Sequence, residues 1–162
     1  MKKRIVIKIG TNVIADKSGT LDCNVMESFV NDIAKARSRD NSILLVTSGA
    51  IGAGMAELKI ANRPADVRMQ QACAAVGQSI LISKYREFFS RHGIKVAQIL
   101  LTYNDFINKK SSQNLGNSIS ILSYLFLYTS DFSQDTCLSV FSCYLFWHCL
   151  SFLFFLLDHF LY

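Results

Sequence analysis

The 162-residue chain contains one proline, eight glycines and no C-x-x-C pair among its five cysteines. So little proline and glycine excludes a collagen-like or linker-like composition. A hydrophobic content of 51% excludes a disordered chain. The cysteine spacing argues against a zinc site and against a disulfide framework. A chain of this length corresponds to one domain and is long enough to bury a hydrophobic core.

Basic residues are absent from the last part of the chain, which has no lysine or arginine after Lys110 and no glycine after Gly116. Residues 1–118 therefore carry a formal charge of +8, whereas residues 119–162 carry −3. A basic first part is typical of a soluble surface and of attraction to small anions. Because its lysines and arginines form no run with interleaved aromatic residues, no nucleic-acid partner is predicted.

The last 44 residues contain no Lys, Arg, Glu, Gly, Ala, Asn, Pro or Met, and 33 of them are Leu, Ser, Phe, Tyr, Cys or Trp. All six of these residue types have codons that begin with thymine, which favours a shifted or truncated translation of T-rich DNA. A second interpretation is a membrane anchor at residues 136–157, which have no formal charge, His148 aside; about 20 such residues span a bilayer. A third interpretation is an unusual buried segment.

The first residues of the chain do not have the pattern of a signal peptide for export. Only Ile5-Val6-Ile7 separates the first basic residues from Lys8, and this run is too short for the apolar core of a signal peptide. With no disulfide pattern either, we predict a cytoplasmic protein with reduced thiols. Membrane association through residues 136–157 is the alternative.

Short aliphatic runs alternate with helical patterns in the first part of the chain. Strands are predicted at 4–9, 42–46 and 95–101, and helices at 24–37, 50–58, 66–90 and 108–122.

Within these elements, Asn24 is the predicted N-cap of the first helix. Cys23 and Cys73 are predicted to be buried thiols, and Gly77 indicates close packing. The predicted apolar stripes of the first and third helices are Val25, Phe29, Ile33 and Ala36, and Met69, Cys73, Val76, Ile80 and Tyr85. Alternating strands and helices predict an α/β fold with a parallel sheet covered on both faces.

Lys8-Ile9-Gly10-Thr11, at the end of the first strand, is the first candidate site. Ligands of open α/β sheets lie beyond the carboxyl ends of the strands. A lysine beside a glycine turn with free N–H groups suits phosphate oxygens. The structural alternative is an ordinary surface lysine, although Lys8 interrupts an otherwise buried strand.

The segment 46–54, Val-Thr-Ser-Gly-Ala-Ile-Gly-Ala-Gly, is the second candidate, because it follows a strand and opens a helix. A helix N-terminus attracts anions, and Gly49, Gly52 and Gly54 would let a ligand approach the backbone. The pattern is neither a Walker loop nor a dinucleotide fingerprint. The alternative is tight packing of small residues.

Other reactive residues form no convincing constellation. Ser48 lacks the G-x-S-x-G elbow of a hydrolase, and His92 is the only histidine before the tail. His148 and His159 are not at metal-ligand spacing. Asp105, after the third strand, suits a helix cap as well as a site.

Four segments occur in an order and spacing similar to one family: 5–11 (IVIKIGT), 46–51 (VTSGAI), 74–79 (AAVGQS) and 98–102 (QILLT). Together they resemble the amino-terminal part of the glutamate 5-kinases, of the amino acid kinase family, over about residues 3–122. The kinase portion of pyrroline-5-carboxylate synthase is similar. The resemblance implies a three-layer αβα fold with an open, mainly parallel sheet, incomplete at its carboxy-terminal half.

The resemblance also implies ATP-dependent phosphorylation of the L-glutamate side-chain carboxylate, the first step of proline biosynthesis. Lys8 would be the catalytic residue, contacting the ATP phosphates, with Gly10 and Thr11 shaping the phosphate turn. Ser48 and the N–H groups of Gly49 and Ala50 would bind glutamate. Mg²⁺ would arrive with the nucleotide rather than on ligands of this chain.

The chain departs from the family after about Leu122. Members continue into a strand ending Ile-Asn-Glu-Asn-Asp and then a Gly-Asp-Asn-Asp stretch, and neither is present here. Asp135 lies near the right distance, but the residues before it do not match, so no role is transferred to it. We therefore divide the chain into the amino-terminal part of a kinase domain, 1–122, and an aberrant tail, 123–162.

This departure leads us to expect a chain that is inactive by itself. Two other hypotheses follow: a non-catalytic module held at a membrane by its tail, and an interaction protein whose open sheet edge pairs with a second copy or with an intact kinase.

Overall fold

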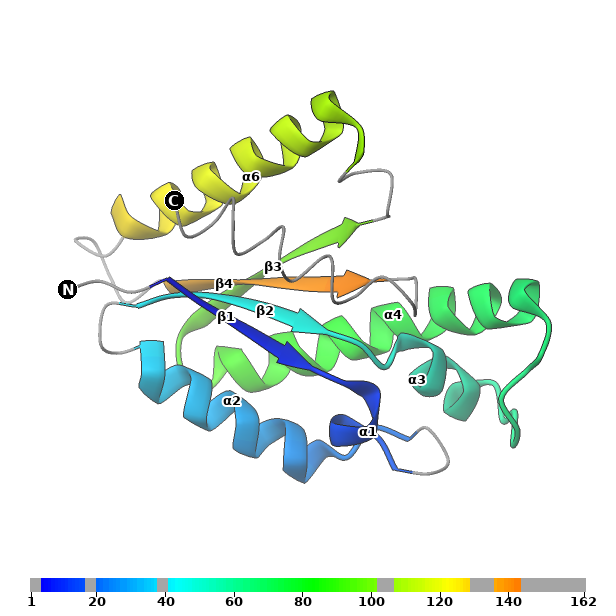
Figure 1. The fold of residues 1–162 in the computed structure, drawn as a ribbon. Helices are drawn as coiled ribbons and strands as arrows, with labels where there is room; N and C mark the ends of the chain where they lie inside the picture. The colour runs from blue at the N-terminus through cyan, green and yellow to red at the C-terminus, as the bar shows by residue number, and fades with distance from the viewer. Residues whose placement is uncertain (1–3, 17–19, 38–40, 102–106, 129–135, 144–162) are drawn as a thin grey trace.

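The computed structural model describes residues 4–16, 20–37, 41–101, 107–128 and 136–143. Its centre is a sheet of four strands, β1 (Arg4–Ile9), β2 (Ser42–Thr47), β3 (Ile94–Leu101) and β4 (Thr136–Cys143). Their order across the sheet is β1-β2-β4-β3, and every neighbouring pair is parallel (Figure 1). The predicted parallel α/β sheet is therefore confirmed.

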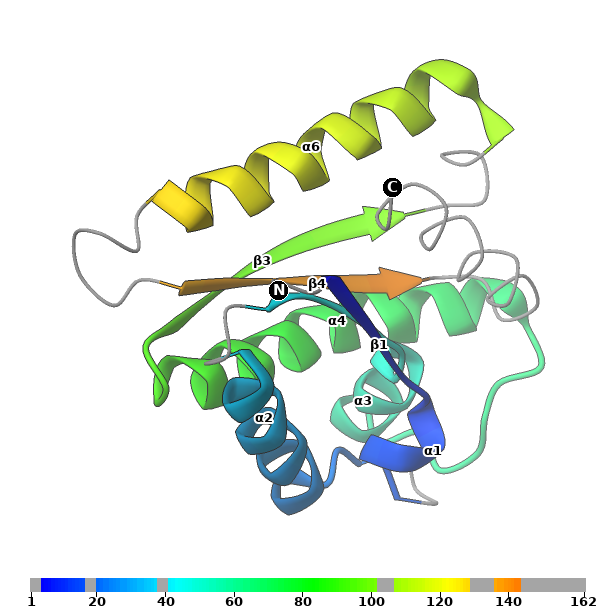
Figure 2. The ribbon, with the colours of Figure 1, turned by 60° about the vertical axis from the view of Figure 1, so that its left-hand side comes forward.

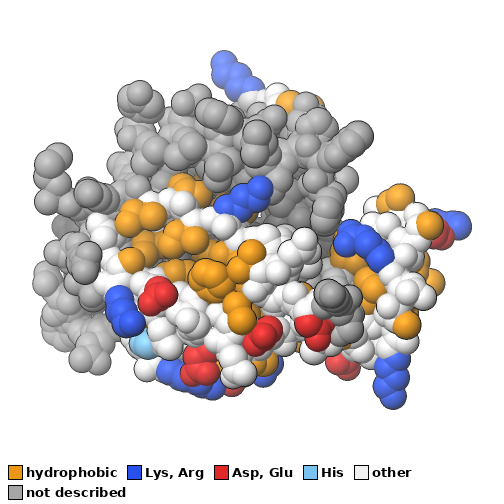
Figure 3. Space-filling view, turned by 60° about the horizontal axis from the view of Figure 1, so that its bottom comes forward, with side chains coloured by type: hydrophobic (Ala, Val, Ile, Leu, Met, Phe, Trp, Pro, Cys, Tyr) orange, Lys and Arg blue, Asp and Glu red, His pale blue; other side chains and the backbone are white. Residues whose placement is uncertain are grey.

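Helices cover both faces of this sheet. One face carries α1 (Thr11–Ile14), α2 (Cys23–Arg37), α3 (Ala50–Glu57) and α4 (Val67–Ser90), and the other carries α6 (Lys109–Tyr128), as Figures 1 and 2 show. The result is the expected three-layer αβα arrangement. On the helix side below the sheet, hydrophobic side chains gather in the centre of the surface and charged side chains surround them (Figure 3).

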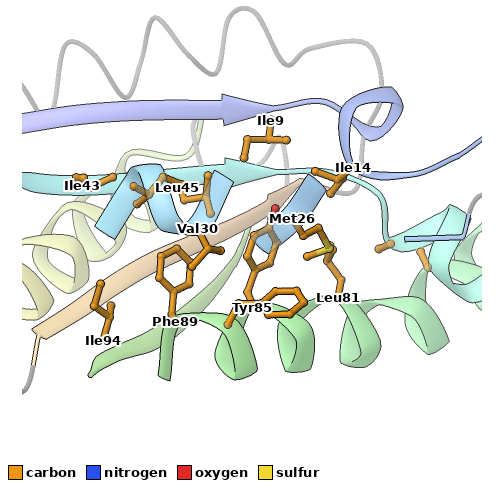
Figure 4. Packing of buried hydrophobic residues seen from close by; sticks show 14 residues of the cluster. Ile9, Ile14, Met26, Val30, Ile43, Leu45, Leu81, Tyr85, Phe89 and Ile94 are labelled. Carbon is orange, nitrogen blue, oxygen red and sulfur yellow. The ribbon is translucent and has the colours of Figure 1, made fainter. Parts of the chain in front are cut away.

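The hydrophobic core explains why β2 is a continuous apolar run. Ile43 and Leu45 face the layer of α2 and α4, whereas Leu44 and Val46 face α6, where Leu115 and Ile119 pack against them. A strand buried on both faces lacks the alternation of polar and apolar residues. Figure 4 shows Val30 of α2 and Tyr85 and Phe89 of α4 beneath β2.

The strand β4 was not predicted. Its eight residues, Thr136–Cys143, are the first part of the segment considered as a membrane anchor, and they pair with β2 on one side and β3 on the other. This part of the segment therefore pairs within the sheet, while residues 144–157 lie outside the described residues. None of the helices in the described part of the chain is long and apolar enough to cross a membrane.

The cap of α2 differs from the prediction. The carboxylate of Asp22 accepts hydrogen bonds from the backbone N–H groups of Asn24 and Val25, at 3.0 and 3.1 Å. Asp22 therefore caps the helix, and Asn24 lies inside its first turn. The predicted start of α4 is confirmed, because the Asp66 side chain accepts a hydrogen bond from the N–H of Arg68.

Two predictions of burial were wrong. Met69 is 46% exposed, because the first turns of α4 project beyond the edge of the sheet (Figure 1). Cys23 is exposed as the first residue of α2, whereas Cys73 is buried as predicted. The buried face of α4 runs instead through Cys73, Ala74, Gly77, Gln78, Leu81, Tyr85, Phe88 and Phe89.

Glycines bring α3 and α4 into backbone contact. A Cβ atom at Gly54 would lie 1.8 Å from the carbonyl oxygen of Cys73, and one at Gly77 would lie 1.9 Å from that of Ala50. The close packing predicted for Gly77 is confirmed. Gly54 was predicted to admit a ligand, but α4 occupies that space, so this part of the small-residue segment serves helix packing.

Candidate functional site

The two candidate turns meet where β1 and β2 end. Ile9 and Thr47 are partners in the register of these parallel strands. Beyond them, the backbone N–H and the hydroxyl of Ser48 both donate to the carbonyl oxygen of Ile9, each at 3.2 Å. The Thr11 hydroxyl donates to Ser48 Oγ at 3.1 Å. Hydrogen bonds thus join residues that lie 37 positions apart in the sequence.

These bonds fix the orientation of the Ser48 hydroxyl and its hydrogen-bonding partners. Its proton points to Ile9, and one of its two lone pairs accepts the proton of Thr11. An incoming carboxylate therefore has two ways to bind here. It can replace the Ile9 carbonyl as the acceptor of the hydrogen bond from the Ser48 hydroxyl, or it can accept hydrogen bonds from the backbone N–H groups that follow Ser48.

Those N–H groups belong to the first turn of α3. Gly49 has φ 120°, a conformation that favours glycine, and the helix begins at the next residue. The first hydrogen bond of the helix runs from the N–H of Ala53 to the carbonyl oxygen of Gly49, at 2.9 Å. The N–H groups of Ala50, Ile51 and Gly52 precede it and have no partner within the helix. They form the positive end of the helix dipole.

A loop after β1 supports Gly49 from the other side. A Cβ atom at Gly49 would lie 3.4 Å from Cδ1 of Ile14 and 3.8 Å from Cδ2 of Leu21. Ile14 is fully buried, and an antiparallel bridge between Ala15 and Leu21 holds the two ends of this loop together. The turn after β2 is therefore packed as well as hydrogen-bonded.

The phosphate candidates lie on β1 and just after it. Lys8 is exposed, and because side chains alternate along a strand, it lies on the α6 face of the sheet rather than with Ile9. Among the described residues Lys8 has no ion-pair partner. Gly10 has extended backbone angles, and no described atom lies within 4 Å of where its Cβ would be. This side of the turn is open.

Comparison with known proteins decides the family. The model of the amino acid kinase family matches residues 3–126. The chain belongs to the amino acid kinase family. The resemblance seen in four short segments is thereby confirmed over most of the described structure.

Curated members of this family include close relatives named as glutamate 5-kinases. The chain is 46% identical over 126 residues to the one from Methanosarcina barkeri, covering 74% of this chain and 33% of the relative. It is 41% identical over 119 residues to the one from Caldanaerobacter subterraneus, covering 74% of this chain and 32% of the relative. The chain thus spans about a third of the length of these relatives.

In this amino acid kinase chain, sequence reasoning missed two residues behind the site. Thr47 is 1% exposed and Tyr85 is fully buried, and their hydroxyl oxygens lie 2.9 Å apart. Burial raises the pKa of Tyr85 to about 12. The available signals were a polar residue ending an apolar strand and a tyrosine on a buried helical stripe.

The remaining reactive residues do not join the site. His92 follows the C-terminus of α4, at the other end of the strands, and its ring bonds to the Asn31 side chain at 2.8 Å. The described residues contain no group of three or more metal-binding side chains. Asp105, Asp135, His148 and His159 lie outside the described residues. Ser48 therefore has no histidine partner among the described residues.

Proposed function

We propose that the junction of β1 and β2 binds L-glutamate and the phosphates of ATP, as part of a glutamate 5-kinase active site. The reaction transfers the γ-phosphoryl group of ATP to the side-chain carboxylate of glutamate, as the first step of proline biosynthesis in the cytoplasm. In this proposal Lys8 is catalytic, Gly10 and Thr11 shape the phosphate turn, and Ser48, Gly49 and Ala50 bind glutamate.

One observation carries the proposal: the hydrogen bonds from Thr11 to Ser48 and from Ser48 to Ile9 bring the two candidate turns to one edge of the sheet. A phosphoryl transfer between two anions needs both sites side by side. The names of the relatives support this pairing of ligands.

The chemistry suits the residues present. A carboxylate oxygen of glutamate attacks the γ-phosphorus, a new O–P bond forms, and the bond to the β–γ bridging oxygen breaks to release ADP. The side chain of glutamate is already ionised at neutral pH, because its pKa is about 4.3, so the reaction requires no protein base. The Lys8 ammonium would offset the charge that develops on the phosphoryl oxygens.

Magnesium fits this scheme as a companion of the nucleotide. The phosphate oxygens of ATP are ordinary Mg²⁺ ligands, so the ion would enter the site bound to the nucleotide. When bound, the ion neutralises phosphate charge, and the residues of this chain contribute the Lys8 ammonium and backbone N–H groups.

Calorimetric titration of the whole 162-residue chain with L-glutamate, and separately with MgATP, tests the proposal. We expect Lys8→Ala to weaken MgATP binding about tenfold and Ser48→Ala to weaken glutamate binding about tenfold, each with little effect on the other ligand. Lys35→Ala, which removes an exposed lysine of α2, is the matched control. D-glutamate controls for nonspecific anion binding.

A coupled assay for glutamate-dependent ADP formation then measures turnover. Our expectation is that the chain alone gives no turnover above background. Binding of neither ligand, or equal binding by the wild type and both site variants, would refute the proposed site.

A further inference from the structure

We propose that Tyr85 and Thr47 are positioning residues that fix the peptide between Ser48 and Gly49, so that the Gly49 N–H points to the bound anion. This inference rests on the proposed function, because the anion is the carboxylate of glutamate. The sequence predicted no role for either residue, although Thr47 lies within the candidate segment 46–54; Tyr85 lies on α4, 37 positions after Ser48.

The direction of each hydrogen bond follows from the acceptors. The Thr47 hydroxyl lies 3.3 Å from the carbonyl oxygen of Ser48, which can only accept, so Thr47 donates to it. A hydroxyl has one proton. In the 2.9 Å contact between the two side chains, Tyr85 is therefore the donor and Thr47 the acceptor. The chain of bonds runs from Tyr85 through Thr47 to the backbone of Ser48.

The carbonyl of Ser48 and the N–H of Gly49 belong to the same peptide group. Because that group is planar and trans, its C=O and N–H point in opposite directions. Holding the Ser48 oxygen on the Thr47 side therefore turns the Gly49 N–H away from the protein interior. The bond that satisfies the Ser48 carbonyl thus also orients the Gly49 N–H toward the ligand.

This peptide needs to be held because glycine follows it. Gly49 has φ 120°, and glycine populates positive and negative φ almost equally, so rotation of the preceding peptide meets little steric resistance. A rotated peptide would point the Ser48 carbonyl at an anion in place of the Gly49 N–H. The hydrogen bond from Thr47 opposes that rotation.

The support for the bond is rigid. The Tyr85 ring is fully buried and lies 6.2 Å from the Phe89 ring, in a stacked arrangement, and Figure 4 shows both rings rising from α4 toward the strands. Water does not compete for hydroxyl groups that are buried to this degree. The same helix contacts Ala50 through Gly77, so α4 positions both the peptide and the start of α3.

The test compares Tyr85→Phe, Thr47→Val and the double variant. We expect each single variant to weaken L-glutamate binding about 3- to 10-fold, and the double variant to add little more, because the two side chains act in one chain of bonds. MgATP affinity should stay unchanged. Thr47→Ser keeps a hydroxyl and should restore glutamate binding. Phe88→Leu, which removes a buried ring of the same helix but neither hydroxyl nor the Phe89 ring that stacks on Tyr85, should leave glutamate affinity unchanged in the folded protein.

A second readout needs no ligand. The Gly49 amide resonance of the ¹⁵N-labelled chain should shift or broaden in Tyr85→Phe and Thr47→Val but not in Phe88→Leu. If the wild type binds no glutamate, the proposed function fails, and this resonance alone decides whether the peptide is held. If glutamate affinity and the Gly49 resonance are both unchanged in Tyr85→Phe and Thr47→Val, the inference is overturned while the proposed site stands.

Discussion

Gly77 of α4 lies directly against the backbone of Ala50, the first residue of α3. A Cβ atom at position 77 would lie 1.9 Å from the carbonyl oxygen of Ala50 and 2.3 Å from the backbone nitrogen of Gly54. Backbone atoms cannot move aside as the end of a flexible side chain can. The position of the start of α3, and with it the candidate glutamate turn, therefore requires glycine, which has no side chain, at residue 77.

We predict that Gly77→Ala lowers the free energy of unfolding by about 2–3 kcal/mol, as overpacking of a tight contact does. Gly116→Ala is the matched control, because Gly116 lies inside α6 and no atom of the described residues lies within 4 Å of its would-be Cβ. Alanine there should stabilise the protein by about 1 kcal/mol. Urea denaturation measures both variants, and a stability for Gly77→Ala equal to that of the wild type would contradict the contact.

Arg91 joins two helices at the surface. Its guanidinium forms ion pairs with Glu27 of α2 and Glu87 of α4 and lies 5.0 Å from the centre of the Phe88 ring. All three charged side chains are more than 40% exposed, so we expect Arg91→Ala to cost at most about 1 kcal/mol. The cost should shrink as salt is raised from 0.05 to about 0.5 M. A loss that does not depend on salt would assign the effect to packing on Phe88 instead.

Alkaline pH provides a separate test of the buried tyrosine. The pKa of Tyr85 is about 12 in the folded protein and about 10 in the unfolded chain. The unfolded chain therefore loses its proton first, and stability falls as pH rises from 10 to 12, by about 3 kcal/mol at most. We predict that the difference in stability between the wild type and Tyr85→Phe changes across this interval and is constant below pH 9. A constant difference at every pH would mean that Tyr85 ionises as freely as an exposed phenol.

The composition of residues 119–162 gives a prediction at the level of DNA. If this segment is a shifted translation, another frame downstream of the Asn114 codon should encode Ile-Asn-Glu-Asn-Asp soon after the codon of Leu122. Sequencing the coding DNA and translating all three frames gives the answer. Absence of that stretch from every frame would make residues 123–162 an authentic part of this protein.

Much of the fold could be predicted because its signals are local. The aliphatic runs predicted as strands at 4–9 and 42–46 became β1 and β2, and the long periodic segment predicted at 66–90 became α4. The meeting of Thr11 and Ser48 also agrees with the sequence-based placement of both turns, because the carboxyl ends of parallel strands lie at one edge of a sheet.

The misses have a common physical origin in contacts between distant residues. Nothing near Thr47 in the sequence indicates that Tyr85 will supply its hydrogen bond. The strand β4 has a composition that fits a membrane span as well as a sheet, and only its pairing with β2 and β3 distinguishes the two. Asp22 and Asn24 are both good caps, and the choice depended on where the preceding loop enters α2.

The strand order β1-β2-β4-β3 has a consequence for how the chain is made. Within the described residues β3 pairs with β4 alone, and each partner lies 42 positions later in the sequence, as in Ile94 with Thr136. During synthesis β3 leaves the ribosome well before its partner. Its backbone N–H and C=O groups then await a neighbour, and an unpaired strand is a template for other chains. We therefore expect docking of β4 to be the late step of folding, and nascent chains that end before it to need chaperones that cover an open strand.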